Sequence, residues 1–155
     1  MINDGVWWNI GCGDATLVGW VNLDRHAENP AVTQCDLEKP WPSEDSLADY
    51  IRAHDIIEHL HDKIFTMNEA WRVLKPGGLM DIVVPTTEGS GAFQDTTRVS
   101  FWNRRSFLYY EAGSPYRDRF AAAYGIKAKF LVKHEKIEQT VDGPKLRITL
   151  EAVKP

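Results

Sequence analysis

Apolar positions in the first third of the chain fall in short runs rather than at helical spacing. Each run is bounded by glycine, proline or an acidic residue, and such runs of about four to eight residues are typical of buried strands. The first passes into the glycine turn Gly11-Cys12-Gly13, and the next two end on Asp24 and Asp36. The pattern predicts strands over residues 7–10, 20–23 and 31–35.

The middle of the chain changes to helical periodicity between two further predicted strands, residues 47–53 and 79–84. Asp55, followed three residues later by Glu58, has the form of a capping box and predicts a helix start. The run Lys75-Pro76-Gly77-Gly78 predicts the helix end, because the residue before proline avoids helical geometry. The apolar positions at helical spacing are Ile64, Met67, Trp71 and Leu74.

The C-terminal part predicts a helix capped by Asn103 and two long strands, residues 127–138 and 145–153. Asp142-Gly143 between these strands is a strong hairpin signal. Strands that alternate with helices indicate an α/β fold. We expect a Rossmann-like, mostly parallel sheet with helices on both faces and a C-terminal antiparallel hairpin strand.

Composition limits the class of protein. A chain of 155 residues that is 43% hydrophobic and 26% charged suits a single domain, residues 1–155. No stretch approaches the roughly 18 apolar residues needed to span a bilayer, and we expect a cytoplasmic protein without a membrane span. Cys12 and Cys35 are interpreted as reduced thiols, with no metal site.

Charge is unevenly distributed along the chain, although the net charge is only −4. Residues 1–85 hold 14 acids and 6 Lys or Arg (−8), and residues 86–155 hold 8 acids and 12 Lys or Arg (+4). An acidic pI of about 5.7 gives no strong nucleic-acid signal. The basic second part is either a solvated face or a surface for an anionic acceptor.

The turn after the first predicted strand indicates a nucleotide-type cofactor site. Gly11 and Gly13 allow backbone conformations that a Cβ forbids, and they let a ligand approach the main chain. An acid at the tip of the second strand, here Asp24, is placed to accept hydrogen bonds from both ribose hydroxyls. A strand-end acid that caps a turn is the structural alternative for Asp24 and Asp36.

Five blocks in order carry a resemblance to a known family: residues 9–13, 19–24, 35–37, 57–60 and 69–78. The chain resembles class I S-adenosylmethionine-dependent methyltransferases, in particular a short bacterial and phage subgroup. The resemblance implies S-adenosyl-L-methionine as the cofactor, with Asp24 on the ribose, Asp36 on the adenine amine and His54 near the methionine part. The implied cofactor-binding residues are Gly11, Cys12, Gly13, Asp24, Asp36, Leu37 and His54.

Two departures from the family pattern bear on cofactor binding. Only 13 residues separate Gly11 from Asp24 (24 − 11), against the usual ~20. The first crossover is therefore expected to be abbreviated. Because only residues 1–5 precede the first strand, we also expect no N-terminal helix over the cofactor, and hence weak binding or a need for a partner chain.

In methyl transfer the protein mainly positions the acceptor, and a base that takes one proton is helpful but not always needed. Among His54, His59 and His61, we predict His59 as the catalytic base, since the loop after the fourth strand opens at the carboxyl edge of the sheet. A histidine that merely bonds to backbone is the alternative. Arg98 stands where the subgroup has histidine; it cannot act as a base and is predicted to clamp an anionic acceptor.

Aromatic and arginine side chains are interleaved after the fifth predicted strand. We weigh three interpretations: core packing, an acceptor site that stacks a sugar or base, and a dimer surface. The aromatic residues are Phe101, Trp102, Phe107, Tyr109, Tyr110, Tyr116, Phe120 and Tyr124.

The predicted function is methyl transfer to a small-molecule, sugar or glycolipid-precursor acceptor, with a homo-oligomer left open. The alternatives are a non-catalytic S-adenosylmethionine-binding module or partner subunit, and an NAD-dependent oxidoreductase. The C-terminal hairpin and the Lys-Pro-Gly-Gly run disfavour the oxidoreductase.

Overall fold

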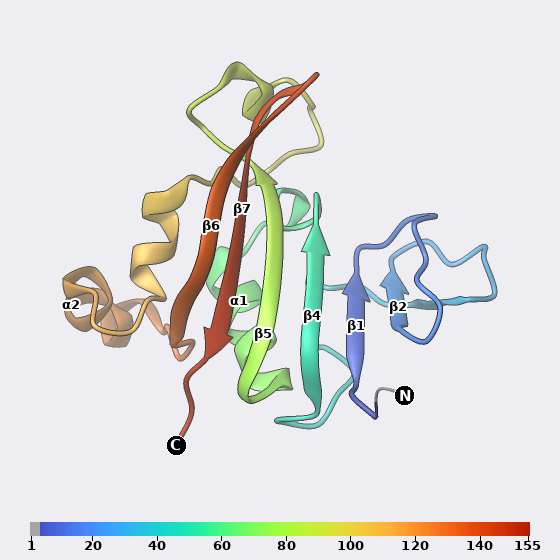
Figure 1. The fold of residues 1–155 in the computed structure, drawn as a ribbon, viewed down its shortest axis with the longest axis horizontal. Coiled ribbons are helices and arrows are strands. Elements are labelled where there is room, and N and C mark those ends of the chain that lie inside the picture. The colour runs from blue at the N-terminus through green and yellow to red at the C-terminus, as the bar shows by residue number, and fades with distance from the viewer. Residues whose placement is uncertain (1–3) are drawn as a thin grey trace.

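A computed structural model describes residues 4–155, which form one seven-stranded sheet in the order β3-β2-β1-β4-β5-β7-β6 (Figure 1). The strands are β1 (Trp7–Ile10), β2 (Val21–Asp24), β3 (Val32–Gln34), β4 (Ala48–His54), β5 (Leu74–Pro85), β6 (Phe130–Thr140) and β7 (Gly143–Ala152). The α-helices are α1 (Lys63–Val73) and α2 (Pro115–Tyr124), and the 3-10 helices are η1 (Ile57–His59), η2 (Ser90–Phe93) and η3 (Arg104–Tyr109).

Strands β1 to β5 are parallel, whereas β7 pairs antiparallel with both β5 and β6. The predicted Rossmann-like, mostly parallel sheet with a C-terminal antiparallel hairpin is confirmed. The hairpin turns at Gly143, whose φ of +100° is a conformation that favours glycine.

The helices differ from expectation in one respect: α1 packs on one face of the sheet, whereas α2 packs against η3 beyond the edge strand β6 (Figure 1). Along the central strands, Ile51, Met80 and Ile148 face the α1 side and are fully buried with Met67 of α1. The connections 11–20 and 25–31 contain no helix. The second face of β4, β5 and β7 is therefore left without helical cover.

Helix α1 begins later than the capping box predicted. Asp62 is its N-cap, and the Asp62 carboxylate accepts a hydrogen bond from the Phe65 N–H. Asp55 instead has a φ of +55°, and Glu58 is buried in the short helix η1. The helix ends at Val73, and the chain continues directly into β5, which is longer than the predicted strand.

The uncovered face of the sheet carries a polar network centred on Asp81. Its carboxylate is 2.8 Å from His54 Nε2 and 2.9 Å from Arg147 Nη2, and only 3% of the side chain is exposed. Burial opposes ionisation of Asp81. The hydrogen bonds from His54 and Arg147 outweigh it and lower the pKa of Asp81 to about 2.

Asp81→Asn is expected to destabilise the fold by about 2 kcal/mol near neutral pH, because it removes an acceptor of charge-assisted hydrogen bonds. A carboxyl whose folded pKa is lowered stabilises the protein above its unfolded pKa of ~3.9, and this contribution is lost as pH falls towards the folded value. Urea unfolding between about pH 5 and pH 2 should therefore show a steeper acid loss in the wild type than in the variant. Asp118→Asn, at an exposed position on α2, is the control. Equal acid slopes in wild type and Asp81→Asn would contradict the assignment.

Candidate active site

The carboxyl ends of the parallel strands meet at one edge of the sheet, and a cavity of about 130 Å³ lies there. It brings together Gly11, Asp24, Asp36, Leu37 and His59, which the sequence analysis singled out one by one. The residues that line it are Gly11, Asp24, Arg25, Cys35, Asp36, Leu37, Glu38, Ile56, His59 and Leu60.

Gly11 lines the cavity and packs so closely against Ile56 that a side chain would not fit at this position. Its φ is +60°, and a Cβ at this position would lie 2.2 Å from Ile56 Cγ1. Gly13 has a similar φ of +51° but has nothing within 4 Å of a built Cβ. The two glycines of the turn thus share a backbone conformation, and only Gly11 is needed for close packing as well.

Asp24 connects the glycine turn to the tip of β2. Its Oδ2 accepts from the Gly13 N–H at 2.8 Å, and its Oδ1 accepts from the His26 N–H at 2.9 Å. A carboxylate has about four lone-pair sites, so both oxygens can still accept from a ligand. Asp24 therefore caps a turn, as the structural alternative predicted, and it also lines the cavity.

The donor and acceptor chemistry of the cavity fits an adenosine-type group. Asp24 and Asp36 offer carboxylate acceptors for hydroxyl and amine hydrogens, and the buried Leu37 provides an apolar wall. The cavity is smaller than the roughly 300 Å³ of typical ligand pockets, so a ligand of nucleoside size extends beyond it. Cys35 is a free thiol on the wall, and burial raises the pKa of this thiol.

Four of the predicted site residues do not line this cavity. Cys12 is buried beneath the turn and donates its backbone N–H to Leu23 O, and Gly13 is exposed. His54 lies on the uncovered face of the sheet with Asp81. Arg98 donates to the Gly91 carbonyl, and its Nε is buried without a partner in the described part of the chain.

His59 has the geometry of a proton acceptor. Its Nδ1 is 3.0 Å from the Thr97 carbonyl oxygen, which can only accept, so Nδ1 carries the ring hydrogen. The neutral ring then has its lone pair on Nε2. Because His59 lines the cavity and is 30% exposed, Nε2 can exchange protons with a ligand or with water.

Glu58 is the functional candidate that the sequence analysis missed. Its side chain is only 3% exposed, and neither carboxyl oxygen has a hydrogen-bond partner among residues 4–155. Burial, followed by the nearby Asp55 charge, raises the pKa of Glu58 to about 8. The spacing of Asp55 and Glu58 was interpreted as a capping box at a helix start. For this reason the sequence analysis did not predict that Glu58 is buried.

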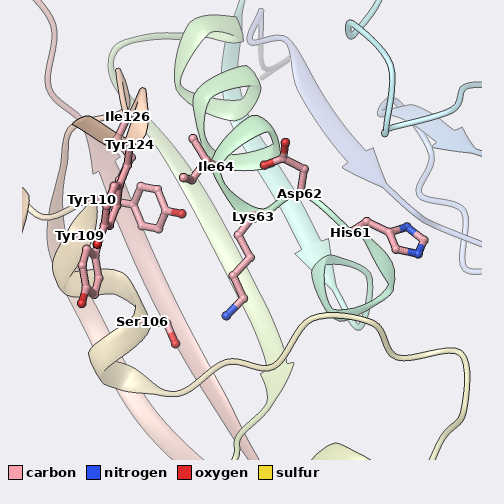
Figure 2. Close-up of a pocket in the computed structure, with 9 residues that line it drawn as sticks. All are labelled: His61, Asp62, Lys63, Ile64, Ser106, Tyr109, Tyr110, Tyr124 and Ile126. Atoms are coloured by element: carbon pink, nitrogen blue, oxygen red, sulfur yellow. The ribbon is translucent and has the colours of Figure 1, made fainter. Parts of the chain in front are cut away.

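A larger cavity of about 630 Å³ lies between the start of α1 and the segment from η3 to the end of α2 (Figure 2). His61 joins it to the first cavity, since Glu38 Oε1 accepts from the His61 N–H at 2.7 Å. Lys63 Nζ lies 4.7 Å from the Trp102 ring centroid, and burial lowers the pKa of Lys63. Its lining residues are His61, Asp62, Lys63, Ile64, Ser106, Tyr109, Tyr110, Tyr124 and Ile126.

The aromatic residues of this region divide between core and surface. Trp102, Phe107 and Tyr110 are buried in the core. A surface cluster comprises Tyr109, Tyr116, Phe120 and Tyr124, with Arg105 and Arg119 at 5.6 and 5.0 Å from ring centroids. Core packing accounts for the first set, and the second set remains accessible next to the larger cavity.

The chain is similar to methyltransferases of known sequence and structure. A family model described as a methyltransferase domain matches residues 9–82, slightly less than half of the chain. No curated protein matches the sequence.

Among residues 4–155, no helix is long and apolar enough to cross a membrane.

Solved structures share the fold at low sequence identity. A chain of the complex between the Haloferax volcanii Trm112 methyltransferase activator and a methyltransferase has a TM-score of 0.69 at 15% identity, over 97% of this chain and 83% of that chain. The 16S rRNA (adenine(1408)-N(1))-methyltransferase of Catenulisporales acidiphilia has 0.61 at 15% identity, over 98% and 86%. The 1,6-didemethyltoxoflavin-N1-methyltransferase of Burkholderia thailandensis has 0.65 at 13% identity, over 97% and 72%.

The family match covers β1 to β5 and the cavity at their carboxyl ends. Together with the shared fold, it supports an enzyme of the S-adenosylmethionine-dependent methyltransferase type, with S-adenosylmethionine as the cofactor.

Proposed function

We propose that the protein transfers a methyl group from S-adenosylmethionine to a small-molecule acceptor, such as a sugar or a glycolipid precursor. The observation that carries the proposal is the cavity in which Gly11, Asp24 and Asp36 meet at the carboxyl edge. The helix-free connection 11–20 supports a place in the short bacterial and phage subgroup.

The cofactor supplies the reactive methyl group on its sulfonium, and the chain's residues hold and orient it. In the proposed arrangement Asp24 accepts from the ribose hydroxyls, Asp36 accepts from the adenine amine and Leu37 packs on the adenine. His59 takes the proton that the acceptor releases. Arg98 clamps an anionic group of the acceptor, which requires its guanidinium to turn away from Gly91.

The tyrosine-lined cavity supports a ring-shaped acceptor of small-molecule size. Its volume of about 630 Å³ falls within the range of ligand pockets. Figure 2 shows the rings of Tyr109 and Tyr110 on one side and Lys63 on the other. The Catenulisporales enzyme acts on an rRNA adenine, and the Burkholderia enzyme acts on 1,6-didemethyltoxoflavin. This fold therefore accommodates acceptors of different classes.

Asp24→Ala is expected to weaken binding of S-adenosylhomocysteine by about 1.5 to 3 kcal/mol, the range for hydrogen bonds to a charged group. Isothermal titration measures the change. Because Asp24 also holds the Gly13 turn, Asp24→Asn serves as a second variant that keeps one acceptor oxygen. Asp118→Ala on α2 should bind like the wild type. Unchanged affinity in both Asp24 variants, with circular dichroism intact, would exclude the ribose assignment.

A cofactor-binding subunit without chemistry of its own is the second candidate. The small volume of the first cavity favours it, because much of a bound cofactor would lie outside the chain. The Haloferax structure is a complex with a methyltransferase activator. Turnover of S-adenosylmethionine by the isolated chain with a metabolite extract would favour the enzyme. Strong S-adenosylhomocysteine binding without turnover would favour the subunit.

A further inference from the structure

A basic pocket lies at the edge of the sheet opposite the cofactor cavity. Because β7 runs antiparallel to β5 and to β6, the end of β7 and the start of β6 lie where the parallel strands begin. Figure 1 shows the C-terminus at this edge, away from the arrowheads of β4 and β5. The pocket has a volume of about 450 Å³ and shares no residue with the two cavities of the candidate active site. Four cations line it beside Trp71: Arg117, Lys127, Lys129 and Lys154.

No acidic side chain neutralises the basic pocket. Its four cations belong to the 12 basic residues of the second part of the chain, for which a solvated face and an anion-binding surface were the two interpretations. None of the ion pairs within 4.0 Å among residues 4–155 includes one of the four. Asp45 acts on the charge of Lys154 but is itself paired with Arg72, 3.0 Å away. Because like charges that converge repel one another, a bound anion would stabilise this arrangement.

Hydrogen bonds hold the walls of the basic pocket in place. Arg117 Nε of α2 donates to the Ala128 carbonyl at 3.0 Å, and Trp71 Nε1 of α1 donates to the Val153 carbonyl at 3.0 Å. The Val153 N–H in turn donates to the Lys129 carbonyl at 2.9 Å. The two helices and both ends of the hairpin are thus joined around the pocket, so the frame that carries the cations exists before a ligand binds.

The two lysines before β6 keep their ammonium groups available for a ligand. Within the described chain, Lys127 and Lys129 enter hydrogen bonds through the backbone alone. Lys154 Nζ, by contrast, donates to the Arg72 carbonyl at 2.9 Å and to the Ser46 hydroxyl at 3.0 Å. Burial lowers the pKa of Lys154, and a nearby anion would oppose this effect.

We propose that the basic pocket binds a short polyphosphate, such as the diphosphate or triphosphate group of a nucleotide. Phosphate oxygens match both kinds of cation in the pocket, because a guanidinium binds them as a planar fork and an ammonium as a point charge. Several converging cations match several adjacent phosphate groups better than a single one. The net charge of −4 disfavours a long nucleic-acid strand, since the strand beyond the pocket would meet an acidic protein. The site goes beyond the proposed function and does not depend on it.

Isothermal titration of the full chain with sodium tripolyphosphate tests the site. We expect one-to-one binding that is about tenfold or more tighter than the binding of orthophosphate, because more of the cations are engaged. The double substitution Lys127→Gln with Lys129→Gln should weaken tripolyphosphate binding by about tenfold or more, since two charge-assisted donors are lost. The fold should be unaffected, because neither side chain bonds to another described residue.

Lys133→Gln with Lys136→Gln is the matched control, because it removes the same two charges from β6. These lysines pair with Glu151 and Glu138 and do not line the basic pocket. Tripolyphosphate affinity should stay within about threefold of the wild type. Equal losses in the two double variants would show a response to net charge alone and would overturn the proposal. Absence of tripolyphosphate binding in the wild type would overturn it as well.

A single-stranded RNA of about ten nucleotides represents the alternative ligand, and we expect it to bind more weakly than tripolyphosphate at ~0.15 M salt. Tighter RNA binding that is lost in the Lys127→Gln, Lys129→Gln variant would make this edge a nucleic-acid surface and overturn the polyphosphate assignment. That variant should keep its S-adenosylhomocysteine affinity within about twofold, because the two cavities share no residue. A wild type that binds tripolyphosphate but not S-adenosylhomocysteine would contradict the proposed function and support the basic pocket.

Discussion

Glu58→Gln is expected to stabilise the protein at about pH 8 by roughly 2 to 4 kcal/mol. The carboxyl titrates at about 8 in the folded chain, whereas an exposed glutamate titrates near ~4.3. Between these values the folded state holds a proton that the unfolded state has released, so stability falls as pH rises. The amide keeps the shape of the carboxyl and removes this loss.

Thermal unfolding at about pH 5 and pH 8 measures the effect, which corresponds to roughly 5 to 12 °C at the higher pH. The difference between variant and wild type should shrink towards pH 5, because the unfolded carboxyl approaches its own pKa of ~4.3 and releases less of its proton there. Glu44→Gln, at an exposed position, should change the midpoint little at either pH. A variant that is less stable than the wild type at pH 8 would show that Glu58 is a structural residue. Greater stability of the variant at pH 8 is what a functional acid predicts.

Gly11→Ala is expected to destabilise the fold by about 2 to 5 kcal/mol and to abolish measurable cofactor binding. Part of the loss comes from the left-handed backbone, which costs about 1 to 2 kcal/mol with any Cβ. The remainder comes from Ile56, because the new Cβ would lie 2.2 Å from its Cγ1 and 2.5 Å from its Cδ1. Ile56 also lines the cofactor cavity, so its displacement changes the cavity directly.

Gly13→Ala is the matched control for Gly11→Ala. The two positions share φ near +50° to +60°, and a Cβ at Gly13 meets nothing within 4 Å. Urea unfolding should therefore give Gly13→Ala only the backbone part, about 1 to 2 kcal/mol. Equal losses in the two variants would mean that the Ile56 contact adds nothing.

Most strands could be predicted because each has a short apolar run with a clear boundary. The runs ending at Asp24 and Asp36, and the Asp142-Gly143 turn, located β2, β3 and the hairpin to within a few residues. Helix α2 was not predicted, because apart from Ala121 its residues are exposed or half-buried, with no regular apolar face. The uncovered second face of the sheet was also not predicted, because it depends on connections that contain no helix.

The candidate site was predicted where function depends on strand ends, and missed where it depends on packing. Gly11, Asp24, Asp36 and Leu37 meet because parallel strands end at one edge. His54 was expected in the site, but strand alternation directs it to the opposite face and to Asp81. Ile56 and Glu58 carry no motif that marks burial.

Isothermal titration of the full chain with S-adenosylhomocysteine, with NAD as the matched control, tests the central claim most directly. Both ligands present an adenosine to the cavity of Gly11, Asp24 and Asp36, but only the first carries the methionine part of a methyl donor. The proposed function predicts one-to-one binding of S-adenosylhomocysteine, lost in Gly11→Ala, and no measurable binding of NAD. Binding of NAD with equal or greater affinity, or no binding of S-adenosylhomocysteine, would contradict it.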